Sequence, residues 1–211
     1  MKRGAAIACA GLLALAATAC STGPQRHARG ERPLPLGANP SAVIAADLAF
    51  ARAAQDLGQW SGYARFAAAE AQLYAPDPVN ALQWLKGRAN PAVAARWQPY
   101  RVWSSCDGSL AATHGARQGA DGAAGQYLTV WQRQRDGSFK WLLDVAGPVD
   151  APLARPEMLS ATVADCPAPR AVPDTSLSWR IGAPEGGTRA VELYLMQGGQ
   201  RQTVLRFDMQ E

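Results

Sequence analysis

The spacing of apolar residues changes once along the chain, near position 97. Before this point, apolar side chains recur at intervals of three and four residues, which is the period of amphipathic helices. After it, apolar and polar residues alternate, which is the period of strands that bury one face. Helices followed by a run of short strands predict an α+β fold, in which the N-terminal helices pack on an antiparallel sheet.

Four helices are predicted in the first part of the chain. The first is the clearest, because its apolar residues share one face and Gly58 follows as a stop signal. Asp77-Pro78 and Asn90-Pro91 each place a capping side chain directly before a proline, which favours the start of a helix. The predicted helices cover residues 41–57, 59–74, 77–87 and 90–96.

Strands are predicted in two groups. Asp107-Gly108 and Asp136-Gly137 are typical of tight hairpin turns within the first group. That group is an antiparallel meander with strands at 97–105, 109–118, 126–135 and 139–145. A proline-rich segment, 148–173, then precedes strands at 177–181, 189–196 and 202–207. The pattern therefore predicts a main domain at 41–148 and a C-terminal β extension at 149–211.

The second hairpin has two registers that the sequence leaves open. A two-residue turn at Asp136-Gly137 places Asp144 opposite Thr129, and a three-residue turn places it opposite Leu128. The second register is favoured because it gathers four aromatic residues on one face. These are Tyr127, Trp131, Phe139 and Trp141.

The opposite face of this hairpin is apolar as well, since it carries Leu128, Val130 and Leu142. A sheet that is apolar on both faces needs cover on both. The helices can cover one face. A second subunit or the C-terminal strands are therefore expected to cover the other.

The first twenty residues are typical of an export signal. A basic start, Met1-Lys2-Arg3, precedes an apolar run of 16 residues at 4–19, shorter than the about 20 that a membrane-spanning helix needs. Ala17-Thr18-Ala19-Cys20 resembles a bacterial lipoprotein box, with Ala17 where such boxes usually carry leucine. Residues 1–19 are predicted to be the signal peptide, Cys20 the lipidated residue and 20–40 a flexible tether.

Ser21, directly after the cysteine, resembles the residue that sorts a bacterial lipoprotein to the outer membrane. The expected location is therefore the periplasmic face of the outer membrane, held by the lipid alone. Two alternatives remain at this point. Ordinary signal peptidase could cut at the same small residues and release a soluble periplasmic or secreted protein, or the apolar segment could stay attached as an anchor.

The net charge bears on the expected binding partners, and the cysteine content bears on an expected disulfide. Net charge is +4, and it falls to +2 without Lys2 and Arg3; the remaining arginines are scattered, so nucleic acid is not an expected partner. Once Cys9 and Cys20 are assigned to the signal and the lipid, Cys106 and Cys166 remain. In an oxidising compartment this pair favours a disulfide over two buried thiols. No metal-ligand spacing, phosphate loop or nucleophile elbow is present, so no metal or cofactor is expected.

Three stretches carry a resemblance to a known family: AFARAAQDLGQWSGYARFAAAEAQLYAPDPVNA, WQPYRVWSSCDGSLAATHG and GQYLTVWQRQRDGSFKWLLDVAG. They resemble the nuclear transport factor 2-like superfamily, among it bacterial members related to ketosteroid isomerases and SnoaL-like cyclases, over residues 41–148. The resemblance implies a cone, formed by a strongly curved antiparallel sheet around the helices, with a pocket inside and often a homodimer. No catalytic set carries over, and Ser109 stands where related sequences often have an aspartate.

Two residues are candidates for acid–base chemistry. His114 alternates in phase with Leu110 and Ala112, and an imidazole titrates near working pH; it could equally be a hydrogen-bonded structural histidine. Asp144 lies between apolar residues, where burial would raise its pKa, and it could equally accept backbone hydrogen bonds at a strand end.

The aromatic residues can line a pocket or fill a core, and the sequence does not decide between these. The pocket hypothesis names Trp60, Phe66, Trp84, Trp103, His114, Tyr127, Trp131 and Trp141. It places His114 at the wall of a partly open cone, with Trp103 and Trp131 in the lining. The favoured function is binding of a small apolar molecule or a protein partner. The alternative is a lyase, isomerase or hydrolase that uses His114 and Asp144.

Overall fold

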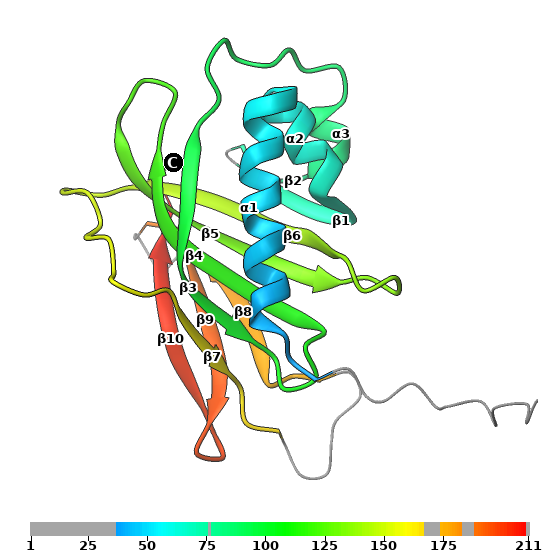
Figure 1. The fold of residues 1–211 in the computed structure, drawn as a ribbon, viewed down its shortest axis with the longest axis vertical. Helices are drawn as coiled ribbons and strands as arrows, with labels where there is room; N and C mark the ends of the chain where they lie inside the picture. The colour runs from blue at the N-terminus through cyan, green and yellow to red at the C-terminus, as the bar shows by residue number, and fades with distance from the viewer. Residues whose placement is uncertain (1–36, 76, 167–173, 183–187, 210–211) are drawn as a thin grey trace, which may run out of the picture. The chain divides into compact units, whose positions relative to one another are not determined.

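The computed structural model describes residues 37–75, 77–166, 174–182 and 188–209. Within these ranges the protein is an α+β fold, as predicted, with helices on one side of a large curved sheet (Figure 1). The helices are α1 (Pro40–Leu57), α2 (Gln59–Phe66) and α3 (Ala81–Leu85). None of these helices is both long and apolar enough to cross a membrane. The predicted signal peptide and Cys20 lie outside the described residues.

The strands of the described residues form two sheets. Seven strands pair in the order β2-β1-β6-β5-β4-β3-β7, and three pair in the order β10-β9-β8. Their bounds are β1 (Ala67–Tyr74), β2 (Pro78–Asn80), β3 (Arg96–Ser104), β4 (Leu110–Gln118), β5 (Ala124–Arg133), β6 (Phe139–Pro148), β7 (Ser160–Val163), β8 (Leu177–Gly182), β9 (Ala190–Gln197) and β10 (Gln200–Asp208). Strands β3 to β6 form the predicted antiparallel meander, whereas β1 pairs with β6 and β7 with β3 in parallel.

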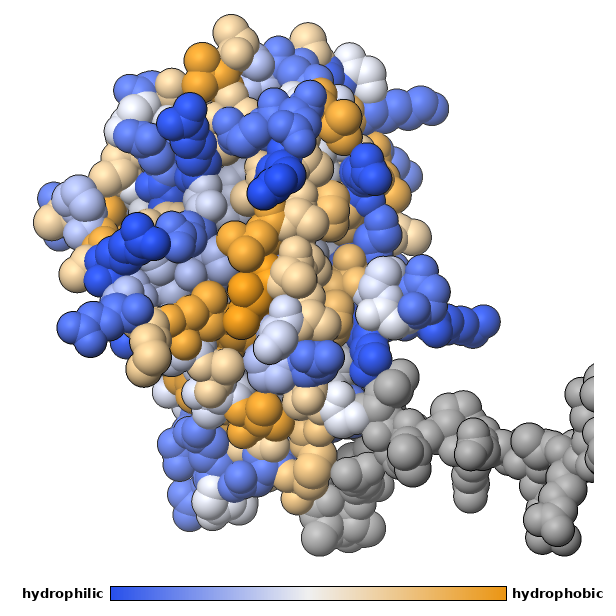
Figure 2. Space-filling view, in the orientation of Figure 1, coloured by the Kyte–Doolittle hydropathy of each residue, from blue (hydrophilic) through white to orange (hydrophobic). Residues whose placement is uncertain are grey.

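Helix α1 forms where the sequence predicts it. The Asn39 side chain accepts a hydrogen bond from the amide of Ala42 at 3.2 Å, and Pro40 occupies the first helical position. One stripe of the helix is buried, with a repeat of three and four residues: Val43, Asp47, Phe50 and Ala54. The opposite side is exposed, and Figure 2 shows small and apolar residues over its N-terminal half, whereas Arg52 and Asp56 are exposed nearer its end.

The second predicted helix is too long. It ends at Phe66, and the alanine-rich segment that follows is strand β1. Alanine favours helix, but here Ala67 pairs with Trp141 of β6 and Leu73 pairs with Val79 of β2. Ala71 is fully buried in this arrangement. Pairing with two strands and burial in the core outweigh the intrinsic preference of the segment.

The third and fourth predicted helices are also corrected. The third starts at Ala81 and not at Asp77, because Asn80 is the capping residue: its side chain accepts from the amide of Gln83 at 3.0 Å. Residues 90–95 are not helical. The side chain of Asn90 instead accepts from the amide of Trp60 at 2.7 Å, so it caps the start of α2, where Gly58 has no side chain to do so.

The second hairpin combines features of both registers. Its turn has three residues, since the amide of Gln134 donates to the carbonyl of Ser138, and Trp131 pairs with Trp141 as favoured. A bulge in β6 then shifts the register by one residue, and Asp144 pairs with Thr129 and not with Leu128. The bulge turns Asp144 toward the helices, onto the same face as the aromatic residues.

Two apolar cores lie on the two faces of the seven-stranded sheet. The helix-side core contains Phe50, Trp131 and Trp141, all fully buried. The core between the sheets contains Leu128 and Val130 together with Phe207 of the C-terminal strands. The C-terminal strands β8 to β10 therefore cover the second face, which was one of the two alternatives that the sequence left open. Because of the bulge, Leu143 takes the place predicted for Leu142, which packs against the helix-side core.

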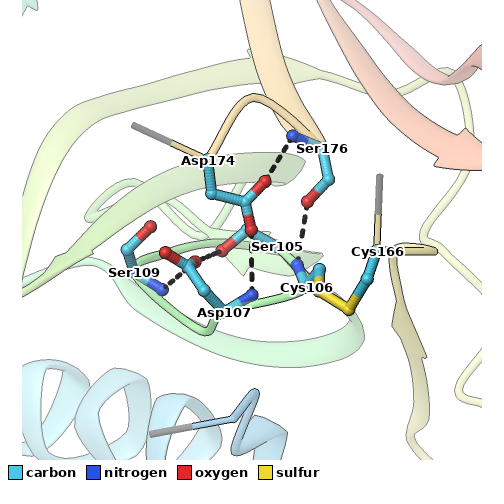
Figure 3. Close-up of a disulfide and its surroundings, with 7 residues drawn as sticks. All are labelled: Ser105, Cys106, Asp107, Ser109, Cys166, Asp174 and Ser176. Carbon is cyan, nitrogen blue, oxygen red and sulfur yellow. Dashed lines mark hydrogen bonds between the residues drawn. A yellow bond between two sulfur atoms is a disulfide. The ribbon is translucent and has the colours of Figure 1, made fainter. Parts of the chain in front are cut away.

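A disulfide joins Cys106, in the turn between β3 and β4, to Cys166, beyond β7. Their Cα atoms are 5.0 Å apart, and the two residues are 60 positions apart in sequence. Hydrogen bonds continue this link toward β8 (Figure 3). The amide of Cys106 donates to the hydroxyl of Ser176 at 2.8 Å, and the amide of Asp107 donates to the carboxylate of Asp174 at 2.9 Å. The turn of the main sheet is therefore tied to the start of the C-terminal sheet.

Candidate functional site

A cavity of about 870 Å³ opens beside the helix-side core. Its walls come from α2, α3, β1, β4 and β6 and from the residues that flank β9 and β10. Aromatic and charged side chains line the cavity. The aromatic ones are Trp60, Tyr63, Tyr74 and Trp84, the cationic ones are Arg117 and Arg189, and the acidic ones are Asp77 and Asp144. The cavity therefore combines large apolar surface with a small number of charged groups, as ligand sites commonly do.

Strand register explains why the space is open at this end of the sheet. On the helix side, the cross-strand row of Ala111, Trp131 and Trp141 is filled by indole rings. Further along the strands, Gly115 and Ala146 flank Tyr127, and Gly125 lies beside Arg117. Ala146, Asp144 and Arg117 border the cavity. At Gly115 and Gly125, the backbone of a neighbouring strand lies where a side chain would be, so only glycine fits there.

Asp144 is the acidic group at the floor of the cavity. It is 9% exposed and accepts a hydrogen bond from the hydroxyl of Thr129 at 2.6 Å, and the side chain of Tyr63 also acts on its pKa. Burial raises the pKa of Asp144 to about 6, and the two hydroxyls and the positive charge of Arg117 oppose that rise. Near neutral pH this carboxyl can therefore accept or release a proton toward a molecule in the cavity.

A second buried carboxyl, Asp47, lies in the middle of α1. It is fully buried and accepts hydrogen bonds from Trp97 Nε1 and from the hydroxyl of Tyr127, both at 2.9 Å. Burial raises its pKa to about 6, against the effect of these donors, and the nearby charge of Asp144 raises it further. Asp47 does not line the cavity, so it acts on the site through Tyr127 and through its charge.

Sequence reasoning missed Asp47, although a signal was present. Positions 43, 50 and 54 are apolar and lie on one helical face, and Asp47 falls in the same stripe. A charged residue in an apolar stripe indicates a buried polar network. Tyr63, Tyr74, Arg117 and Arg189 were missed for a different reason, because their place in the cavity depends on contacts between distant elements.

His114 does not lie in the cavity. It pairs with Leu128 on the other face of the sheet, where its ring is 6.5 Å from that of Trp103 and 6.3 Å from that of Phe207. The imidazole nitrogen Nε2 is 3.1 Å from Oε1 of Gln126, and burial lowers the pKa of His114. The predicted position at the cavity wall is wrong, because alternation along a strand separates two faces without indicating which face meets the helices.

The same geometry corrects the lining proposed for Trp103 and the pairing proposed for the acid–base groups. Trp103 is in the core between the sheets, on the face opposite Trp131. Asp144 is on the helix side and His114 on the other side of the same sheet, so the two cannot act together on one ligand. The histidine is instead the hydrogen-bonded structural residue of the alternative interpretation.

The aromatic residues divide between the pocket and the core. Trp60 and Trp84 line the cavity, with their ring centroids 5.3 Å apart in an edge-to-face arrangement. The other aromatic residues predicted for the pocket on this side pack into or against the helix-side core or bind Asp47. These are Phe66, Tyr127, Trp131 and Trp141. Within the described residues, no group of three or more His, Cys, Asp or Glu side chains is arranged to hold a metal.

No protein-family model and no curated protein matches this sequence. Among solved structures, the crystal structure of a proposed ketosteroid isomerase from Parabacteroides distasonis is similar, with a TM-score of 0.41 and 12% sequence identity. The similar region covers 56% of this chain and 98% of that chain. A similarity at this level assigns neither a family nor an activity.

Proposed function

We propose that the protein is a lipid-anchored envelope protein whose main domain binds a small, largely apolar molecule that contains a ring. The cavity carries this proposal: about 870 Å³ is within the size range of ligand pockets, and Trp60 and Trp84 present aromatic surface at its wall. Flat aromatic side chains on a cavity wall favour planar apolar ligands. The carboxyl of Asp144 supplies a polar group that can orient such a molecule.

We further propose that residues 41–148 form a nuclear transport factor 2-like domain, with the sheet as a cone around the helices. Helices on one face of a curved sheet and a cavity beside them support this assignment. Strands β8 to β10 then serve as a cover for the outer face. The homodimer that the family resemblance implies gains no support from that face, because the C-terminal strands of the same chain already cover it.

Export is the second part of the proposal. The apolar N-terminal segment and Cys20 motivate an anchor on the periplasmic face of the outer membrane. The disulfide between Cys106 and Cys166 supports an oxidising compartment, since such bonds persist outside the cytoplasm.

Lipidation is expected to depend on Cys20. In a bacterial host fed an alkyne-labelled fatty acid, the wild type should carry the label and Cys20→Ser should lose it, because the thiol of this residue accepts the lipid. Cys9→Ser is the matched control: it removes a cysteine from the signal peptide and should leave labelling unchanged. Equal labelling of the wild type and Cys20→Ser would contradict the anchor.

Ligand binding is expected to be blocked by filling the cavity. The neutral fluorophore N-phenyl-1-naphthylamine should bind the wild type, and Ala146→Trp should weaken that binding by about tenfold or more, because the loss of even a few buried apolar contacts has this effect. Ala146 is exposed and lines the cavity, so the added indole occupies it without entering the core. The measurement is a fluorescence titration.

Ala120→Trp provides the control, since it adds the same side chain to an exposed loop. It should bind the fluorophore like the wild type. An affinity that is the same in the wild type and in Ala146→Trp, with both proteins folded, would show that this cavity is not the binding site.

A further inference from the structure

One cation of the cavity, Arg117, has no acidic partner in the part of the chain that the structure describes. Arg117 is partly buried and lines the cavity, and its Nε atom is buried without a hydrogen-bond acceptor. Among the residues that the structure describes, no carboxylate oxygen lies within 4.0 Å of its guanidinium. A guanidinium presents five donors in a planar fork, and leaving such donors unpaired when buried is unfavourable.

The acidic groups of the cavity are already engaged elsewhere. Asp77 is paired with Arg189 at 3.5 Å near the rim, and this aspartate is largely exposed. Asp144 accepts a hydrogen bond from Thr129, and it interacts with Arg117 only through charge at a distance. The guanidinium therefore has free donors in a cavity whose carboxylates are satisfied by other groups.

The surroundings of Arg117 leave space for a ligand group. Arg117 lines the cavity of about 870 Å³, and its partner on β5, Gly125, has no side chain that could cover the guanidinium. Aromatic surface from Trp60 and Trp84 lines the same cavity. A ligand could therefore place an apolar group against the two indole rings and an acidic group against the guanidinium of Arg117.

We propose that Arg117 is the anion-binding group of this cavity and that the natural ligand is an amphipathic monoanion: an aromatic or similarly apolar body that carries one carboxylate. This inference rests on the proposed function, because it assigns the ligand class of the same cavity. Carboxylate matches the fork of a guanidinium and accepts two parallel hydrogen bonds from it.

A ligand with one negative charge fits this cavity better than a ligand with two. Asp144 is near the guanidinium, so a second charge on the ligand would lie close to this carboxyl, and the other cation of the cavity, Arg189, is already paired with Asp77. The raised pKa of Asp144 reduces this repulsion for a monoanion, because the carboxyl takes up a proton readily when a negative charge approaches.

The test uses displacement of N-phenyl-1-naphthylamine by two compounds of nearly identical shape. These are 1-naphthoate, which carries the carboxylate, and 1-naphthalenemethanol, which is neutral. For the wild type, the naphthoate should displace the fluorophore at a concentration about tenfold or more below that of the alcohol, since hydrogen bonds to charged groups are worth at least this much. This comparison within one protein does not depend on the folding of any variant.

Variants then assign the preference to Arg117. Arg117→Gln should bring the ratio between the two compounds close to one while the fluorophore still binds, and Arg117→Lys should keep part of the preference because it retains the charge. Arg96→Gln, which removes an exposed arginine of β3, controls for the loss of one positive charge and should keep the full preference.

The outcomes separate the two proposals. If the fluorophore does not bind the wild type, the proposed binding function fails. If it binds but the naphthoate has no advantage over the alcohol, the cavity binds apolar molecules and the anion site is wrong. If the advantage persists unchanged in folded Arg117→Gln, another group provides it and the assignment to Arg117 is overturned.

Discussion

Reduction of the Cys106–Cys166 disulfide is expected to lower the free energy of unfolding by about 4 kcal/mol, according to the chain-entropy relation for a loop of this size. The two cysteines are 60 positions apart, so the bond removes many conformations from the unfolded chain. The hydrogen bonds from Cys106 to Ser176 and from Asp107 to Asp174 remain available after reduction. We therefore expect the folded state to persist with a lower stability.

Denaturant unfolding with and without a reductant measures this effect. The double variant Cys106→Ala/Cys166→Ala is the control: it should unfold near the midpoint of the reduced wild type and should not respond to the reductant. Alanine avoids an unpaired hydroxyl at Cys106, which is buried. A wild-type midpoint that is the same in both conditions would contradict a stabilising disulfide.

Stability is expected to fall as pH rises from about 4 to about 6.5, through the buried carboxyl of Asp47. Its pKa is about 6 in the folded protein and has the ordinary value of 3.8 in the unfolded chain. The folded state therefore binds the proton more tightly, and the stabilisation is complete below about 4 and is lost as pH passes 6. A difference of about 2 pKa units corresponds to about 3 kcal/mol.

The variant Asp47→Asn should reduce this pH dependence, because the amide does not titrate. Its unfolding free energy should be lower than that of the wild type near pH 4. The two oxygens of Asp47 accept from Trp97 and Tyr127, and the side-chain nitrogen that replaces one of them in the variant cannot accept a hydrogen bond. The gap should narrow by about 3 kcal/mol toward pH 7.5. Asp144 has a raised pKa as well, so a residual dependence of the same sign should remain in the variant.

The measurement is a set of denaturant titrations between pH 4 and pH 7.5. Asp56→Asn, which removes an exposed carboxylate from the same helix, controls for the general loss of one negative charge. Parallel profiles for the wild type and Asp47→Asn across this range would show that the buried carboxyl does not drive the dependence.

Local signals in the sequence determined most strands of the two sheets and the disulfide between Cys106 and Cys166. Strands β3 to β6 and β8 to β10 lie close to the predicted ranges, because period-two alternation and Asp-Gly or Gly-Gly turns are properties of short segments. Helix α1 follows for the same reason, from its apolar stripe and its stop at Gly58. Cys106 and Cys166 are the pair that remains once Cys9 and Cys20 are assigned to the expected signal peptide and lipid, and this pair was sufficient to predict the disulfide.

Tertiary structure decided β1, the bulge in β6 and the composition of the cavity. An alanine-rich segment became a strand because β6 and β2 were available to pair with it, and propensity contains no information about partners that distant. One inserted residue in β6 turned Asp144 toward the helices, and turn chemistry at Gly137 could not indicate it. Alternation separated the faces of β4 but did not say which one meets α1, so the face that carries Arg117, and not the face that carries His114, lines the cavity. A period of two defines two faces, and only the packing of distant elements decides which of them lines a cavity.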